Sequence, residues 1–260
     1  MRINHSTNLQ PSTGLGGCNI YFGIPTYDNK VVIKFNTSMV NTALHLKDRG
    51  IGMQMMYSKG DAFIDRGRNS LIDNFLKSPC THLCMIDADQ GWDHEKIYEM
   101  IKCDKDFIAA AVHQKALDPS YAIRVNVDKN KRCVEKDGLI STHRIGMALC
   151  IIKREVFEKI KENNTLIETI NNGTMFTDIH LHYIPGRGYD WVGEDFDFCD
   201  KCIKSGVDIW IYPDINVTHV GQYEFEGNFH EYLCKQPGGK YDKEKLSNGL
   251  RINQLQKEIT

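Results

Sequence analysis

Hydrophobic residues along this chain form short runs that alternate with longer segments of mixed character. The short runs predict β-strands at residues 20–24, 52–57, 82–86, 107–112, 147–152 and 208–212. In the longer segments hydrophobic residues recur at helical spacing, which predicts helices at 33–48, 62–77, 94–102, 154–163 and 194–205. Because strands and helices alternate, the pattern predicts an α/β fold in which helices flank a mainly parallel central sheet.

Two segments, 115–144 and 165–192, interrupt this alternation, because their hydrophobic periodicity weakens and Gly, Asn and Asp accumulate. Such long insertions either decorate the surface or form loops over a functional site. From residue 226 the chain becomes polar, with a short amphipathic piece at 250–259. We expect an N-terminal tail, one domain, and a C-terminal extension that packs on the domain or forms an oligomer contact, at residues 1–17, 18–229 and 230–260.

Composition and charge narrow the function classes. Of the 260 residues 41% are hydrophobic, enough for a sizeable core, and the formal net charge of -2 offers no basic surface for nucleic acid. No hydrophobic stretch approaches the ~20 residues of a transmembrane helix, and residues 1–17 are too polar for a signal sequence. The nine cysteines are odd in number and lie partly in hydrophobic runs, so we expect reduced thiols and a cytoplasmic location.

A single Cys-x-x-Cys pair, Cys199 and Cys202, has no second pair at zinc-finger spacing. Two interpretations stay open for it. The pair is either a metal or redox site, or two cysteines on the buried face of a helix.

The most informative run is residues 82–89, in which a hydrophobic strand ends in two carboxylates, Asp87 and Asp89. A strand that is hydrophobic on both faces suits a sheet covered by helices, where ligands bind at the carboxyl ends of the strands. Residues two apart on a strand lie on the same side, so these carboxylates repel one another unless a cation lies beside them. Their oxygens suit Mg²⁺ or Mn²⁺ bridged to a substrate phosphate. The alternative interpretation is a solvated strand end.

Other segments occur in an order that resembles the nucleotide-sugar-dependent glycosyltransferases of the GT-A fold, in particular inverting, family-2-like members. The resemblance covers roughly residues 18–229. It rests on six segments: 19–27 (NIYFGIPTY), 65–72 (DRGRNSLI), 87–89 (DAD), 145–157 (IGMALCIIKREVF), 193–199 (GEDFDFC) and 210–221 (WIYPDINVTHVG).

The resemblance implies a site for a nucleotide diphosphate sugar. The nucleotide and the donor sugar would contact residues of four segments, namely Pro25, Thr26 and Tyr27, then Arg66 and Asn69, then Asp87 and Ala88, and finally Gly146 and Met147. Arg66 and Arg68 both lie near a helix start, where a guanidinium can bind phosphate oxygens, and we expect only one of them to touch the nucleotide. UDP is the favoured nucleotide and GDP the second.

The resemblance also implies a metal held directly by Asp89 and by the imidazole of His219, with Asp87 on the ribose or a metal-bound water. A shell of oxygen and nitrogen ligands favours Mn²⁺ over Mg²⁺. Such a metal would neutralise the diphosphate that leaves when the sugar is transferred.

Proton transfer would fall to Asp195, the base that withdraws the proton from an acceptor hydroxyl in inverting members, while Glu194 orients the acceptor. The structural alternative is that both residues complement the dipole of a helix N-terminus. Lys115, in a His-Gln-Lys segment that departs from the Tyr-Pro-x-Lys-like element of many relatives, is left as a donor or acceptor contact of open role.

Three functions therefore remain open. The first is metal-dependent transfer of a sugar to a saccharide hydroxyl, with inversion at the sugar. The second is metal-dependent phosphoryl or nucleotidyl transfer by Asp87 and Asp89. The third is a non-catalytic carbohydrate-binding module on the same fold. Convergence of Asp89, Asp195 and His219 on one pocket would favour the first.

Overall fold

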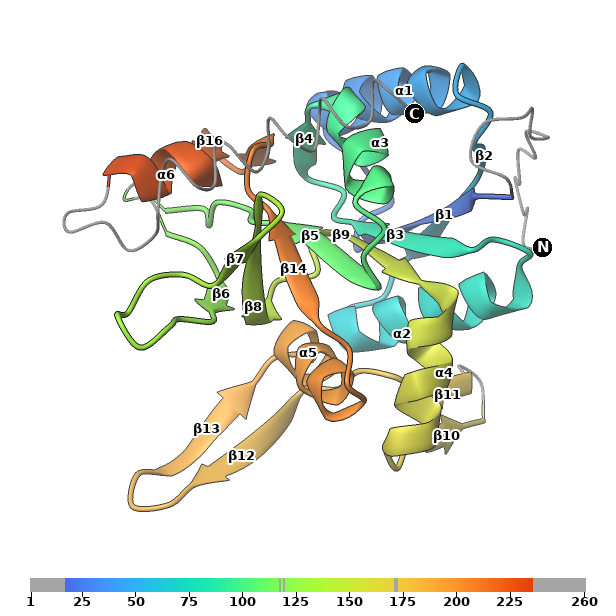
Figure 1. The fold of residues 1–260 in the computed structure, drawn as a ribbon. Helices are drawn as coiled ribbons and strands as arrows, with labels where there is room; N and C mark the ends of the chain where they lie inside the picture. Colours follow the sequence, from blue (N-terminus) through green and yellow to red (C-terminus); the bar gives the residue numbers. More distant parts are fainter. Residues whose placement is uncertain (1–16, 117, 119, 171–172, 236–260) are drawn as a thin grey trace.

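The computed structural model describes residues 17–116, 118, 120–170 and 173–235. Its centre is a nine-stranded sheet in the order β2-β1-β3-β9-β5-β14-β8-β6, with β7 paired to β8 (Figure 1). The strands of this sheet are β1 (Asn19–Thr26), β2 (Gly52–Lys59), β3 (His82–Ile86), β5 (Phe107–Ala110), β6 (Ile123–Val125), β7 (Glu135–Lys136), β8 (Leu139–Ile145), β9 (Leu149–Lys153) and β14 (Ile209–Tyr212).

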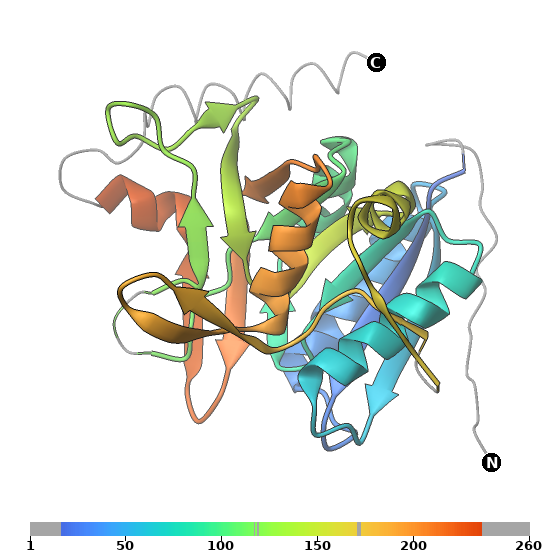
Figure 2. The same ribbon diagram turned by 90° about the horizontal axis from the view of Figure 1, so that it is seen from below.

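Helices cover both faces of the sheet. On one face lie α1 (Ile33–Lys47) and α3 (His94–Lys102), which share one hydrophobic core with the sheet. On the other face, turned toward the viewer in Figure 2, lie α2 (Ile64–Lys77), α4 (Arg154–Asn163) and α5 (Glu194–Lys204), which pack around a second core. The sheet is therefore the middle of three layers.

The predicted strands and helices all form, close to their predicted bounds. The sheet, however, is mixed rather than mainly parallel in its pairing. Strand β9 is antiparallel to both of its neighbours, β3 and β5, and β8 is antiparallel to β14, β6 and β7. A hydrophobic run has the same pattern in both chain directions, so it cannot predict whether neighbouring strands are parallel or antiparallel.

Both insertions contain strands that their weak periodicity did not predict. The first supplies β6, β7 and β8, which extend the central sheet. The second forms two hairpins, β10 (Ile167–Thr169) with β11 (Gly173–Met175) and β12 (His180–Ile184) with β13 (Gly188–Val192), and the latter projects from the body of the protein (Figure 1). The hairpin of β12 and β13 does alternate, with Leu181 opposite Trp191 and Tyr183 opposite Tyr189, so the prediction of weak periodicity was wrong there. Each run is only five residues long, and these hydrophobic side chains are exposed rather than buried in a core.

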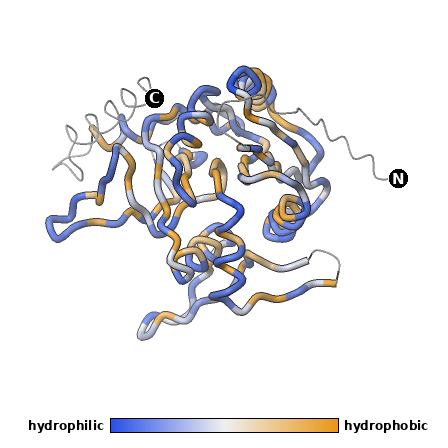
Figure 3. The backbone as a smooth tube through the Cα atoms, turned by 45° about the vertical axis from the view of Figure 1, so that its right-hand side comes forward, coloured by the Kyte–Doolittle hydropathy of each residue, from blue (hydrophilic) through white to orange (hydrophobic). Residues whose placement is uncertain are grey.

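The side chains of β1 point alternately into the two cores, which explains why this strand lies in the interior of the central sheet. In β1, Ile20, Phe22 and Ile24 enter the core beneath α1, while Tyr21 enters the core beneath α2. At Gly23 a Cβ would lie 3.3 Å from Leu83 Cδ1, so this glycine allows the close approach of neighbouring side chains. Along the backbone, hydrophobic and hydrophilic residues alternate within the helices, as expected for segments with one buried side (Figure 3).

A small second sheet holds part of the sixth predicted segment, residues 210–221, next to the turn after β3. It joins β4 (Gln90–Trp92), β15 (Asn216–Val220) and β16 (Glu224–Asn228) in the order β16-β15-β4. Its register places His219 opposite Gln90, and the Val220 N–H donates to the Asp89 carbonyl at 2.8 Å. The sheet thereby fixes His219 beside the acidic turn that follows β3.

The described chain ends in α6 (Phe229–Lys235), whose Phe229 and Leu233 are buried in the core around α2, α4 and α5. The predicted N-terminal tail, except Gly17, and the amphipathic piece at 250–259 lie outside the described residues. None of the helices in the described part of the chain is long and hydrophobic enough to cross a membrane.

Cys199 and Cys202 lie on the buried side of α5, and both are fully buried. The Cys199 thiol donates to the Ile145 carbonyl, and burial raises the pKa of both thiols above the ordinary cysteine value. A buried, protonated thiol is a poor metal ligand and a poor nucleophile. The structure therefore supports the buried-helix interpretation of this pair.

Arg154, at the start of α4, holds the C-terminal end of α2. Its guanidinium donates to the carbonyls of Phe75, Leu76, Ser78 and Cys80 at 2.6–3.0 Å and stacks on the Phe75 ring at 4.6 Å. Two of these carbonyls, those of Phe75 and Leu76, belong to the last turn of α2, where a helix end leaves carbonyls without an intrahelical N–H partner.

We predict that Arg154→Met lowers the free energy of unfolding by about 2–4 kcal/mol, because partly buried carbonyls lose a charged donor. Urea denaturation would measure the loss. The control is Arg144→Met, which removes a surface ion pair with Asp200 at 2.6 Å and should lower the same quantity by less than about 1 kcal/mol. Equal losses in the two variants would contradict the assignment.

Candidate functional site

A cleft of about 590 Å³ lies at the carboxyl ends of β1, β2 and β3, where ligands collect in sheets of this kind. Six residues of the predicted site line it, namely Pro25, Thr26, Tyr27, Asp87, Ala88 and Asp89. Residues that were not predicted also line it, among them Asp28, Lys30, Asp61, Phe63 and Gly67. The structure thus brings the first and third predicted segments into one cavity.

Two aromatic side chains in this cleft are largely exposed: Tyr27 is 72% exposed and Phe63 is 62% exposed. The end of β1, just before Tyr27, is fastened to the end of β2, because the buried Thr26 hydroxyl donates to the Ser58 carbonyl at 2.6 Å. Exposed aromatic faces suit stacking on a planar ligand. No sequence signal distinguished Phe63, which precedes α2 as an isolated hydrophobic residue.

A buried arginine, Arg68 on α2, ties together three of the predicted segments. Its guanidinium lies 3.1 Å from Asp87 Oδ1 and 3.2 Å from Glu194 Oε1, and it donates to the Met147 carbonyl at 3.0 Å. The side chain is only 4% exposed. Arg68 thus neutralises two carboxylates that approach the same point from β3 and α5.

Arg66, in contrast, faces outward. It is about half-exposed, its Nε lies 2.6 Å from Asp61 Oδ2, and its guanidinium stacks on the Phe63 ring at 5.3 Å. Helical spacing could have separated the two arginines, because Arg68 shares one face of α2 with the buried Leu71, Ile72 and Phe75. Arg68 is therefore the arginine that contacts Asp87, and the expectation that only one of the two touches the nucleotide stays a prediction.

Asn69 lies beside Arg68 but outside the cleft lining. Its Oδ1 accepts from the N–H groups of Phe176 and Thr177, and its Nδ2 donates to the Thr177 carbonyl at 2.7 Å. The residue is 2% exposed, so these contacts fasten the segment before β12 to α2. A direct contact with the nucleotide remains a prediction.

The two motif carboxylates lie in the turn after β3 and have different partners. The strand ends at Ile86, so the strand alternation expected to place Asp87 and Asp89 on one side does not apply. Each carboxylate has its own cation instead. Asp87 pairs with Arg68, whereas Asp89 Oδ2 lies 2.6 Å from Lys115 Nζ and 3.4 Å from His219 Nε2.

The orientation of His219 leaves one ring nitrogen available. Its Nδ1 lies 2.9 Å from the His113 carbonyl oxygen, which can only accept, so Nδ1 carries a proton and the neutral ring has its lone pair on Nε2. Burial lowers the pKa of His219, but hydrogen bonds with Asp89 and the His113 carbonyl outweigh it and raise the pKa above its ordinary value. Burial likewise raises the pKa of Asp89, but hydrogen bonds with His219 and Lys115 outweigh it and lower the pKa.

These residues fit a metal that is shared with a substrate. Asp89 Oδ1 is buried and accepts no hydrogen bond from the described residues, so a cation at this carboxylate would satisfy it. Within the described ranges no cluster of three or more His, Cys, Asp or Glu side chains is arranged to hold a metal. A divalent ion on Asp89 and His219 would therefore take further ligands from water and phosphate.

Asp195 and Glu194 begin α5 and have opposite surroundings. Glu194 pairs with Arg68, whereas burial and the neighbouring Glu194 charge raise the pKa of Asp195 above its ordinary value. Asp195 Oδ1 accepts from the Phe196 N–H at 2.8 Å. A Cβ on Gly146 would lie 3.5 Å from Asp195 Oδ2, so this oxygen faces the segment before β9.

The predicted residues converge in part. Asp89 and His219 meet directly, and Arg68 connects Asp87 to Glu194, the neighbour of Asp195. The Asp87 N–H donates to the Ala148 carbonyl at 2.9 Å, which joins the acidic turn to the Gly146–Met147 segment. The acidic turn therefore contacts the Gly146–Met147 and His219 segments directly and the Glu194–Asp195 segment through Arg68.

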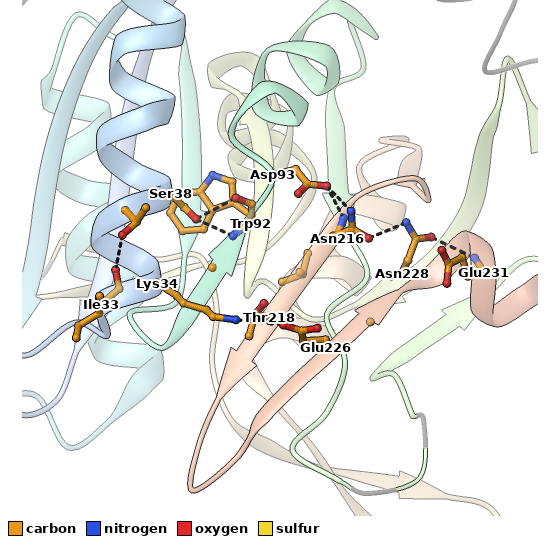
Figure 4. A pocket seen from close by; sticks show the side chains of 14 residues that line it. Ile33, Lys34, Ser38, Trp92, Asp93, Asn216, Thr218, Glu226, Asn228 and Glu231 are labelled. Atoms are coloured by element: carbon orange, nitrogen blue, oxygen red, sulfur yellow. Dashed lines mark hydrogen bonds and ion pairs between the residues drawn. The ribbon is translucent and has the colours of Figure 1, made fainter.

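A second cavity, of about 530 Å³, lies between α1, β4, β15 and β16 (Figure 4). None of the predicted site residues lines it. Its polar side chains bind one another or nearby backbone, as in the pairs Ser38 with Trp92, Asp93 with Asn216, and Lys34 with Glu226. The candidate site is therefore the cleft at the strand ends.

Solved structures of other proteins match this chain at low sequence identity. The protein A197 from STIV matches with a TM-score of 0.50 and 15% sequence identity, over 78% of this chain and 86% of that chain. This chain has the same fold. A crystal structure of a mutant Drosophila beta-1,4-galactosyltransferase 7, in complex with manganese, UDP-Gal and xylobiose, matches with a TM-score of 0.43 and 14% identity, over 88% of this chain and 78% of that chain.

No protein-family model matches the sequence, and no curated protein matches it. The likeness to A197 therefore bears on the fold alone. The predicted α/β fold class, a central sheet flanked by helices, is confirmed, with the sheet mixed as described above.

We predict that Arg68→Met lowers the free energy of unfolding by about 3–5 kcal/mol, because Asp87 and Glu194 lose their buried counter-ion. Urea denaturation would measure it. Arg66→Met, two positions earlier in the same helix, removes an exposed ion pair and an exposed contact with the Phe63 ring, and should lower the same quantity by less than about 1 kcal/mol. Similar losses would show that Arg68 does not hold these segments together.

We predict that Asp195→Asn raises the melting temperature at neutral pH. The folded-state pKa of Asp195 lies above the unfolded value, so this group favours the folded state at pH below the unfolded pKa and loses that contribution as the pH rises through the folded pKa. An uncharged amide does not lose this stabilisation, so the difference in melting temperature between Asp195→Asn and the native protein should narrow as the pH falls toward about 4. Thermal melts across pH would check this.

The control is Glu194→Gln, which removes the carboxylate charge that Arg68 neutralises and should lower the melting temperature instead. If Asp195→Asn lowers the melting temperature as much as Glu194→Gln, Asp195 has a structural partner that stabilises its charge.

Proposed function

We propose that this protein is a metal-dependent glycosyltransferase that transfers a sugar from a nucleotide diphosphate sugar to a saccharide hydroxyl. The observation that carries the proposal is the arrangement around one cleft. Aromatic faces of Tyr27 and Phe63 lie in it, and Asp89, which also lines it, meets His219 Nε2 at 3.4 Å. A nucleoside diphosphate has the same two parts, a planar base and a charged diphosphate.

We assign the base and ribose to Pro25, Thr26 and Tyr27, and UDP is the favoured nucleotide. The diphosphate falls to the end of the cleft formed by Asp87, Ala88 and Asp89. Its negative charge requires a cation there, and when bound, Mn²⁺ or Mg²⁺ on Asp89 and His219 neutralises charge on the leaving diphosphate. Gly146 and Met147 border the donor sugar in this assignment.

Asp195 accepts the proton of the acceptor hydroxyl. A base is most effective when its pKa approaches the working pH, and burial beside Glu194 moves the pKa of Asp195 in that direction. As this proton leaves, the hydroxyl oxygen attacks the anomeric carbon on the face opposite the diphosphate. The bond from that carbon to the diphosphate breaks, and the anomeric configuration is inverted. Glu194, held by Arg68, accepts a hydrogen bond from the acceptor.

Phosphoryl or nucleotidyl transfer would use Asp87 and Asp89 together on metal ions. The pairing of Asp87 with the buried Arg68 at 3.1 Å occupies one of these carboxylates, which favours glycosyl transfer. A protein that only binds carbohydrate needs neither a carboxylate with a raised pKa, such as Asp195, nor a buried carboxylate oxygen without a hydrogen bond from the described residues, such as Asp89 Oδ1.

We predict that UDP together with Mn²⁺ raises the melting temperature, whereas UDP alone has a much smaller effect. A ligand at ~100 times its dissociation constant adds about 2.7 kcal/mol, which corresponds to roughly 5–10 °C for a protein of this size. Asp89→Asn should abolish the Mn²⁺-dependent part. Differential scanning fluorimetry with UDP, GDP and ADP would rank the nucleotides.

Asp104→Asn is the matched control for this experiment. Asp104 is 84% exposed at its side chain, pairs with Lys153 on the surface, and has a φ of 52°, which asparagine accepts. It should respond to UDP and Mn²⁺ like the native protein. The proposal fails if no nucleotide diphosphate raises the melting temperature with either metal.

A further inference from the structure

Lys115 lies on the oxygen that the proposed metal would need. Its ammonium is 2.6 Å from Asp89 Oδ2, and the same oxygen is 3.4 Å from His219 Nε2. A metal held by both Asp89 and His219 Nε2 would lie beside Oδ2, the oxygen that the ammonium contacts. The ammonium and the metal share one position on the carboxylate.

The fold holds Lys115 in this place. A Cβ on Gly221 would lie 3.2 Å from Lys115 Cδ and 3.7 Å from its Cε, so the absence of a side chain at Gly221 makes room for the lysine stem. The preceding His113 is anchored twice, through its carbonyl to His219 Nδ1 at 2.9 Å and by a β-bridge to Tyr121. Lys115 is thus directed at Asp89 by the same segment that orients the histidine.

We propose that Lys115 is a built-in competitor of the metal, which neutralises Asp89 until the metal and the nucleotide diphosphate displace it together. This inference rests on the proposed function. A divalent ion and an ammonium on one oxygen repel each other strongly, so the metal binds only when the ammonium leaves. A lysine has a flexible stem, and the displaced ammonium gains a new partner once diphosphate oxygens are present.

The consequence is coupling between the two ligands. Without nucleotide, the metal must displace Lys115 with nothing to receive the ammonium, so Lys115 weakens metal binding. With nucleotide, the diphosphate receives the ammonium and the penalty disappears. By linkage, Lys115 increases the factor by which UDP strengthens Mn²⁺ binding and the factor by which Mn²⁺ strengthens UDP binding.

The experiment is a Mn²⁺ titration of the full chain, followed by the electron paramagnetic resonance signal of free Mn²⁺, with and without saturating UDP. In Lys115→Met we expect Mn²⁺ to bind about tenfold more tightly without UDP, and UDP to strengthen Mn²⁺ binding by a factor about tenfold smaller than in the native protein. Lys115→Arg, which keeps the charge, should behave like the native protein. Thermal melts would verify that each variant is folded.

Lys34→Met is the matched control, because Lys34 also bridges carboxylates, Glu224 at 2.7 Å and Glu226 at 3.1 Å, outside the proposed site. It should leave both Mn²⁺ affinities unchanged. Equal Mn²⁺ affinities of the native protein and Lys115→Met under both conditions would overturn the inference alone. Absence of Mn²⁺ binding in both proteins, even with UDP, would overturn the proposed metal-dependent function and the inference with it.

A further outcome would also overturn the competition. If neither protein binds Mn²⁺ and Lys115→Met loses UDP affinity, measured by calorimetry without metal, Lys115 itself is the counter-ion of the diphosphate.

Discussion

The buried guanidinium of Arg68 is the interaction on which the rest of the site depends. It joins the turn after β3, the segment before β9 and the start of α5 through Asp87, the Met147 carbonyl and Glu194. Removing a charged group from water is unfavourable unless partners replace the water, and here two carboxylates and a carbonyl do so. Three segments that are distant in sequence therefore meet at one position, and that position adjoins the cleft.

The distribution of cations gives each carboxylate of the site a different character. Asp87 and Glu194 share Arg68, and Asp89 faces Lys115 and His219, so these three groups have nearby positive partners. For Asp195, burial and the Glu194 charge outweigh the attraction of Arg68, and the pKa rises. Four carboxylates in a small region can thus serve as ion-pair partner, cation ligand and proton acceptor, because their surroundings differ.

Secondary structure was largely predictable from the sequence, because buried strands and amphipathic helices leave periodic patterns that local physics produces. The same argument failed for two groups of strands. In the first, β6 and β7 are very short, and β8 has four consecutive polar residues, 141–144, between its hydrophobic ends. In the second, β12 and β13 alternate over only five residues each and expose their hydrophobic side chains. It also could not choose between Arg66 and Arg68 from residue type, although the helical period of α2 favours the buried position for Arg68. Phe63 left no sequence signal.

The sequence by itself determined the α/β class, the positions of most elements and the residue types available for chemistry, since these depend on local hydrophobic pattern. Only the tertiary structure decided which groups meet. The antiparallel register of β15 on β4 places His219 beside Asp89, and the anchoring of His113 directs Lys115 to the same oxygen. Such contacts join residues far apart along the chain, and their geometry follows from strand direction and register, which hydrophobic periodicity does not encode.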